Sequence, residues 1–99
     1  MPPKVPNSMI LGIGSAVPEK VLTNQDLEKI VDTSDEWIRT RTGIERRHIV
    51  DETTKNSELS AQAAKIALQN AGIQPEEIDV ILVATVTGDA TFPSTACYV

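Results

Sequence analysis

Two short and almost uninterrupted apolar runs limit what this chain can fold into. Residues 9–15 read M-I-L-G-I-G-S and residues 78–87 read I-D-V-I-L-V-A-T-V-T. Strands with one solvated face alternate apolar and polar residues, whereas near-continuous runs are typical of strands that are buried on both faces in α/β sheets. Each run is therefore predicted to be a buried strand that needs helices on both sides of its sheet.

Three helices and one further short strand are expected between these runs. A helix start at residues 23–26 precedes an apolar stripe that ends near Asp32, and residues 46–50 are expected to form a short strand. The longest helix is capped by Ser57 and followed by Gly72, and its apolar face consists of Leu59, Ala63, Ile66, Ala67 and Leu68. This order of elements predicts an α/β fold with a parallel component.

The remaining helix has the clearest signals in the chain. Thr33 and Ser34 are good N-cap residues, two acidic residues follow in the first turn, and Gly43 is a typical stop. These signals predict a helix over Ser34–Thr42. Trp37 and Arg41 lie four positions apart, so their side chains share one face of it.

An indole beside a guanidinium can hold a flat aromatic ligand such as an adenine ring, by stacking and cation–π attraction. The alternative from spacing alone is that Trp37 and Arg41 pack on each other at the surface, or that Trp37 is a core residue. Both interpretations remain open at this point.

Charge narrows the kind of ligand. The 99 residues carry a net charge of −5, but residues 39–48 hold four arginines and one glutamate, a local balance of +3, which leaves −8 for the other 89 residues. An acidic body argues against nucleic-acid binding, which needs a broad basic face. The basic island suits a small phosphate-bearing ligand, or it is a solvated helix end whose arginines complement the helix dipole.

The composition excludes several kinds of protein and site. A single cysteine rules out an internal disulfide and leaves no metal-ligand cluster, so no metal site is expected. No apolar run approaches the roughly 20 residues that span a bilayer, and the N-terminus lacks a signal-peptide core. We therefore expect no membrane association and a cytoplasmic location.

The string from Asp32 to Arg47, D-T-S-D-E-W-I-x-T-R-T-G-I-x-x-R, resembles the signature of the beta-ketoacyl-acyl carrier protein synthase III family, the condensing enzymes that start fatty-acid synthesis. The likeness extends from Met9 onward. It includes G-x-G-S-x-x-P-E at 12–19, T-N-x-D-L-E-K at 23–29, A-G-I at 71–73, V-A-T at 83–85 and F-P-S-x-A-C at 92–97.

The resemblance implies a thiolase-like fold of two similar α/β halves, layered helix-sheet-helix-sheet-helix, that works as a homodimer. This chain is then the first part of the N-terminal half. Residues 1–8 are expected to be a flexible leader, and residues 9–99 an incomplete domain that ends before the catalytic cysteine. Two buried strands with too few helices to cover them, and a helix start at 92–99 without a finish, agree with that expectation.

The resemblance also implies the reaction and the partners. An acetyl or other short acyl group passes from coenzyme A to a cysteine, and then to malonyl-acyl carrier protein with loss of carbon dioxide. Coenzyme A thioester is a substrate, and no further cofactor is implied. The alternative, from another functional class, is a non-catalytic thiolase-like module that binds coenzyme A or a partner protein.

By the same resemblance, the adenine of coenzyme A lies between Trp37 and Arg41, with Thr33 close to the ligand. Phe92 reaches across the dimer toward the acyl pocket of the other subunit. No catalytic residue is expected in this segment, and Cys97 is interpreted as a buried small residue rather than the nucleophile. His48, the only histidine, is expected at the surface.

Gly12 and Gly14 form G-x-G without the third glycine of the dinucleotide-binding fingerprint, so that motif is rejected. Glycines at these positions are instead expected to permit the close approach of another backbone.

Overall fold

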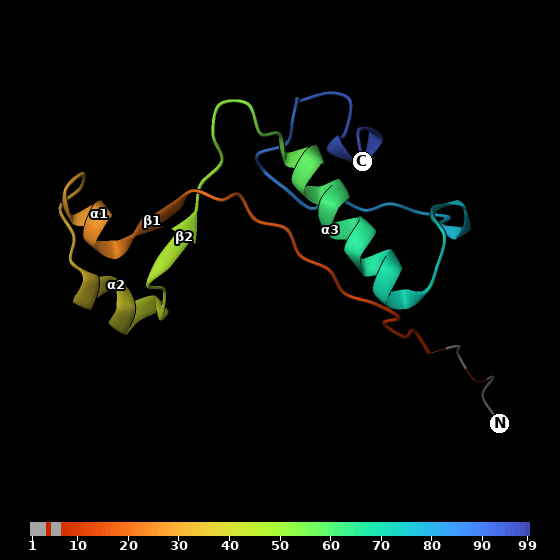
Figure 1. Ribbon diagram of the computed structural model, residues 1–99, viewed down its shortest axis with the longest axis horizontal. Coiled ribbons are helices and arrows are strands. Elements are labelled where there is room, and N and C mark those ends of the chain that lie inside the picture. The colour runs from red at the N-terminus through yellow and green to blue at the C-terminus, as the bar shows by residue number, and fades with distance from the viewer. Residues whose placement is uncertain (1–3, 5–6) are drawn as a thin grey trace. The chain divides into compact units, whose positions relative to one another are not determined.

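The computed structural model describes Lys4 and residues 7–99 (Figure 1). Most of the predicted leader, residues 1–3 and 5–6, lies outside the described residues, so its flexibility stays a prediction. The chain forms two compact units, Val17–Lys55 and Met1–Ala16 together with Asn56–Val99. The elements in chain order are β1 Val21–Thr23, α1 Asn24–Glu28, α2 Asp35–Thr42, β2 Arg46–His48, α3 Asn56–Ala71, and the 3-10 helices η1 Pro75–Glu77 and η2 Thr95–Cys97.

The unit Val17–Lys55 is built on a two-stranded antiparallel ladder with two short helices. β1 pairs with β2 in the register Val21↔His48, Leu22↔Arg47 and Thr23↔Arg46. β1 runs directly into α1, and a turn after α2 leads into β2 (Figure 1). The strand predicted at residues 46–50 is therefore present, although it ends at His48.

Local capping explains where α2 begins and ends. Ser34 is the N-cap, and its hydroxyl accepts a hydrogen bond of 3.1 Å from the Trp37 amide. Gly43 closes the helix in the left-handed region, with φ of 72°, and its amide donates to the Arg39 carbonyl at 2.8 Å. The predicted helix is confirmed to within one residue, because the signals that fix its ends lie in the helix itself.

The helix α1 is shorter than predicted. Thr23 and Asp26 form a capping box, in which each side chain accepts a hydrogen bond from the other residue's amide, at 3.0 and 3.2 Å. The helix ends at Glu28 rather than near Asp32, and Ile30 of the expected apolar stripe lies in the following turn with its side chain exposed. An apolar stripe extends a helix only where another element covers it.

The unit with α3 rests on a close contact between backbones. A Cβ atom added to Gly12 would lie 2.8 Å from the Ala71 amide nitrogen, and one added to Gly14 would lie 2.9 Å from Cβ of Ile66. The side-chain Nδ2 atom of Asn70 also donates to the Ile13 carbonyl at 2.8 Å. The prediction that these glycines permit close approach is confirmed, with the backbone of α3 as the partner.

A carboxylate from far along the chain caps α3. Ser57, predicted as the N-cap, is instead a buried residue inside the first turn, whose amide and hydroxyl both donate to Asp89, at 2.9 and 2.5 Å. The Asp89 amide in turn donates to the buried hydroxyl of Thr95 at 3.2 Å. The end of α3 is as predicted, with Gly72 at φ of 68°.

The two apolar runs are not strands among the described residues, so that prediction is wrong. The only ladder there joins β1 and β2, and no parallel pair occurs. Leu82 is 90% exposed, and Ile10, Ile13 and Val86 are exposed as well. A strand requires a neighbouring backbone to receive its hydrogen bonds, and neither run has one in the described part of the chain.

Two further expectations concern single residues. His48 is exposed, as predicted, with Nδ1 2.6 Å from the carbonyl oxygen of Pro18. Cys97 is also exposed, so its interpretation as a buried small residue is wrong. The chain around it forms the short helix η2, in which Thr95, not Cys97, turns inward.

Candidate functional site

The predicted pair on α2 is brought together by the helix. The Cζ atom of Arg41 lies 4.8 Å from the centroid of the Trp37 ring, a cation–π contact. Ile38 points the other way and is the buried apolar residue of α2, at 9% exposure. The Trp37 side chain is 55% exposed, so it belongs to the outer face of the helix and not to a core.

Trp37 and Arg41 touch each other, which is one of the two arrangements that spacing left open. A flat ring in contact with flat groups on both sides needs them about 7–8 Å apart, because each contact takes roughly 3.5–4 Å. At 4.8 Å the guanidinium occupies that space itself. The predicted slot for a purine is therefore closed in this structure, while more than half of the Trp37 surface remains open.

Asn24 forms hydrogen bonds with residues at both ends of α2, and it is completely buried. Its Nδ2 atom donates to Oδ1 of Asp35 at 2.8 Å and to the carbonyl of Ile44 at 2.7 Å. Its Oδ1 atom accepts from Nη2 of Arg47 at 2.7 Å, and its backbone amide donates to the Glu45 carbonyl at 3.0 Å. Every polar atom of this side chain therefore has a partner.

The arginines of the basic island have different roles. Arg47 is tied to Asn24 and, at 3.3 Å, to the Leu22 carbonyl, so its charge is part of the scaffold. Arg39 forms an ion pair of 3.1 Å with Asp35. Arg41 covers Trp37. The hydrogen bond from the Asn24 side chain lowers the pKa of Asp35 below its usual value, and the Arg39 guanidinium lowers it by a smaller amount.

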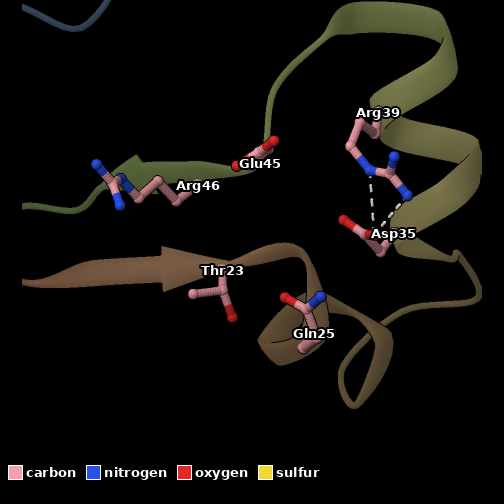
Figure 2. Close-up of a pocket in the computed structure, with 6 residues that line it drawn as sticks. All are labelled: Thr23, Gln25, Asp35, Arg39, Glu45 and Arg46. Carbon is pink, nitrogen blue, oxygen red and sulfur yellow. Dashed lines mark hydrogen bonds and ion pairs between the residues drawn. The ribbon is translucent and has the colours of Figure 1, made fainter.

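A groove of about 370 Å³ lies between the strands and helices of this unit, and Figure 2 shows its lining side chains. The lining residues are Thr23, Gln25, Asp35, Arg39, Glu45 and Arg46. Two acidic and two basic groups balance each other, and one of each, Asp35 and Arg39, is already paired, as the dashed lines in Figure 2 show. The groove therefore has no net charge with which to attract a phosphate.

The other predicted residues lie elsewhere. Thr33 is half-buried and lies just before the Ser34 cap, four positions ahead of Trp37. Phe92 belongs to the other unit and is 89% exposed. A cavity of about 450 Å³ in that unit is lined largely by hydroxyl-bearing residues, among them Thr85, Thr91 and Ser94.

Among the described residues, no group of three or more histidine, cysteine, aspartate or glutamate side chains could hold a metal ion. No helix of the described part of the chain is long and apolar enough to cross a membrane.

Sequence reasoning missed two residues that organise these units, Asn24 and Asp89. Asn24 was included only as part of a helix start, and its burial depends on partners 11 to 23 positions away. Asp89 acts on a helix that begins 33 positions before it. A buried asparagine has no signal of its own in one sequence, because the same residue is common in exposed turns.

Comparison with known proteins gives strong matches over most of the chain, although no protein-family model matches. The chain is 62% identical over 93 residues to beta-ketoacyl-[acyl-carrier-protein] synthase III 1 of Bacillus anthracis, which is 94% of this chain and 30% of that protein. It is 58% identical over 93 residues to the synthase III of Natranaerobius thermophilus. The chain thus spans about 30% of the length of these curated relatives.

Two solved structures of similar enzymes also match this chain. The 3-oxoacyl-[acyl-carrier-protein] synthase III of Aquifex aeolicus matches with a TM-score of 0.80 and 58% identity, over 89% of this chain and 28% of that one. The priming beta-ketosynthase of the R1128 polyketide pathway matches with a TM-score of 0.81 and 32% identity, over 98% of this chain and 30% of that one. The predicted fold class, α/β of the thiolase-like kind, is confirmed over the matched residues.

Proposed function

We propose, from the chain's homology to the beta-ketoacyl-[acyl-carrier-protein] synthase III family, that it is part of a condensing acyltransferase and binds the adenine end of coenzyme A on α2. The reaction of the whole protein joins an acetyl or other short acyl group to malonyl-acyl carrier protein with loss of carbon dioxide. The residues of this chain position coenzyme A, and none of them is proposed as catalytic. The protein acts in the cytoplasm as a homodimer.

The observation that carries this proposal is the open indole of Trp37 with the Arg41 guanidinium beside it. An exposed cation–π contact contributes about 0.5–1 kcal/mol, whereas stacking of a base on an aromatic side chain contributes about 1–3 kcal/mol. Moving Arg41 aside therefore costs less than the stacking that it permits. The purine slot opens when the ligand enters, and the displaced guanidinium then covers the second face of the ring.

Two other residues are assigned by the same homology. Thr33 lies at the entrance to α2 and contacts the same ligand. Phe92 is almost fully exposed, which leaves its ring available to contact a second subunit near the acyl pocket.

The test is the dissociation constant of coenzyme A and the KM for acetyl-CoA in the protein produced from its full coding sequence. Trp37→Ala should raise both by about 5- to 150-fold, which corresponds to the loss of about 1–3 kcal/mol of stacking, and should leave kcat unchanged. Arg39→Ala is the matched control, because Arg39 lies on the same helix but pairs with Asp35. Equal constants for Trp37→Ala and the wild type would refute the adenine site.

The same preparation distinguishes the alternative function. A protein that binds coenzyme A through Trp37 but never condenses acetyl-CoA with malonyl-acyl carrier protein is a binding module and not an enzyme. Formation of the condensed product excludes that alternative.

A further inference from the structure

Asn24 connects to both ends of the helix that carries the proposed site. One hydrogen of its Nδ2 atom goes to Asp35, the first residue of α2, and the other goes to the carbonyl of Ile44, two residues past the last. Trp37 and Arg41 lie between these two anchors. A buried group that fixes both ends of an eight-residue helix also fixes the direction in which its outer face points.

We infer that Asn24 is a positioning residue for coenzyme A, acting through Asp35 to hold the Trp37 face of α2; this inference rests on the proposed function. The position requires two donors and one acceptor on a single short side chain. Asparagine supplies them, whereas aspartate has no donor when it is ionised and leucine has neither donor nor acceptor. Arg47 completes the arrangement, because it fixes which end of the amide carries the oxygen.

The alternative is that Asn24 has a purely structural role. Asn24 could serve only the stability of the unit, as any buried and fully hydrogen-bonded polar residue does. That role predicts variants that unfold more easily yet bind coenzyme A normally while folded. A positioning role predicts that fully folded variants bind coenzyme A more weakly. Misplacement of the Trp37 face by about 1 Å is enough to reduce the affinity.

A matched pair of substitutions isolates the hydrogen bond between Asn24 and Asp35. Asp35→Asn and Asp35→Ala both remove the ion pair with Arg39 and the charge at the helix start. Only Asp35→Asn retains an oxygen that Asn24 can donate to. Asp35 is partly exposed, with 26% of its side-chain surface open, so both variants should fold.

The measurement is the dissociation constant of coenzyme A by calorimetry, at a temperature where circular dichroism shows each variant to be folded. Asp35→Ala should bind about tenfold more weakly than Asp35→Asn, with KM for acetyl-CoA rising in parallel and kcat unchanged. Equal affinity of the two variants would overturn the inference. A wild-type protein that does not bind coenzyme A would instead refute the proposed function, so the two failures are distinguishable.

A polarity swap tests the same bond from the other side. Asn24→Asp places two carboxylates against each other and should weaken binding by about tenfold or more. Adding Asp35→Asn reverses donor and acceptor between residues 24 and 35 and keeps a partner for Arg47, so the double variant should bind about tenfold more tightly than Asn24→Asp alone. The Ile44 carbonyl loses its donor in both of these proteins, so their difference reports only the bond between residues 24 and 35.

Asn56 is the control for the loss of a bridging asparagine. Its Nδ2 atom also makes two hydrogen bonds, to Thr85 Oγ1 and the Thr87 carbonyl, both at 3.1 Å, and it belongs to the other unit. Asn56→Asp should lower the unfolding temperature and leave the coenzyme A constant unchanged. If the swap fails to restore binding while Asn56→Asp weakens it equally, the effect is general destabilisation and the inference is wrong.

Discussion

The contact of residues 12–14 with α3 makes Gly14→Ala the sharpest test of this fold. The added methyl would lie 2.5 Å from the amide nitrogen of Ala67 and 2.9 Å from Cβ of Ile66, and it would also collide with the carbonyl of Ala63. Atoms of a helix backbone cannot rotate away, so the segment itself has to lift from α3. Lifting it also strains the hydrogen bond between Asn70 and the Ile13 carbonyl.

The change in the free energy of unfolding is the sum of three contributions. Overpacking of this kind costs about 1–3 kcal/mol, and the loss of a typical hydrogen bond costs about 0.5–1.5 kcal/mol. Replacing glycine restricts the unfolded chain, which offsets about 0.4–1 kcal/mol. The expected loss is therefore about 0.5–4 kcal/mol in the free energy of unfolding, measured by denaturant titration with circular dichroism.

Gly72→Ala is the control, because Gly72 lies in the same unit with open space around it. It should cost only the strain of its left-handed φ, about 1–2 kcal/mol. Adding Ala67→Gly to Gly14→Ala should not restore stability, since the nearest atoms belong to the backbone. Full stability of Gly14→Ala, or its rescue by Ala67→Gly, would show that the segment does not lie on α3 as described.

Three further outcomes are expected. Asp51 accepts hydrogen bonds from the side chains and amides of Thr53 and Thr54, which lower its pKa to about 2, so its carboxyl resonance should titrate near pH 2 by NMR, and the stability it contributes should be lost as pH falls from about 4 to 2; a midpoint near 4 would contradict the turn. Asp89→Ala removes the cap of α3 and should lower the free energy of unfolding by about 0.5–2 kcal/mol, with no change expected if Ser57 caps the helix instead. Cys97 is exposed and should react with iodoacetamide in the native protein as fast as it does in denaturant, and protection would restore the buried interpretation.

The sequence predicted those features whose causes are local. The ends of α2 follow from Ser34 and Gly43, and the placement of Trp37 and Arg41 on one helix face follows from a spacing of four. The close approach of Gly12 and Gly14 to α3 could also be foreseen, because glycines within an apolar run often mark a place where another backbone comes close.

Features that depend on distant partners could not be foreseen in the same way. Residues 78–87 have a strong strand pattern, yet a pattern supplies no neighbour for the backbone to pair with. The width of the slot between Trp37 and Arg41 depends on a flexible side chain, which spacing does not determine. Burial of Asn24 depends on three separate segments that meet around it.

Different side chains position the candidate site and stabilise the fold. The most buried side chains of the two units are mainly polar, Asn24, Ser57 and Thr95, whereas Ile38 is the apolar member of that set among the described residues. Satisfied hydrogen bonds fix geometry but contribute only about 0.5–1.5 kcal/mol each, while burial of a large apolar side chain contributes about 1.5–3 kcal/mol. Large exposed apolar surfaces mark places where another surface binds, so stability should depend mainly on whatever covers residues 9–13 and 80–86.

A functional consequence follows from this separation. Substitutions in the two apolar runs should change the free energy of unfolding and leave the affinity of the folded protein for coenzyme A intact. Substitutions at Asn24 or Asp35 should lower the affinity of the folded protein for coenzyme A, and those at the completely buried Asn24 should lower the free energy of unfolding as well. A variant such as Leu82→Ser that weakened coenzyme A binding in fully folded protein, with α2 untouched, would show that the two roles are coupled and that the hydrogen bonds of Asn24 are not sufficient to set the direction of the Trp37 face.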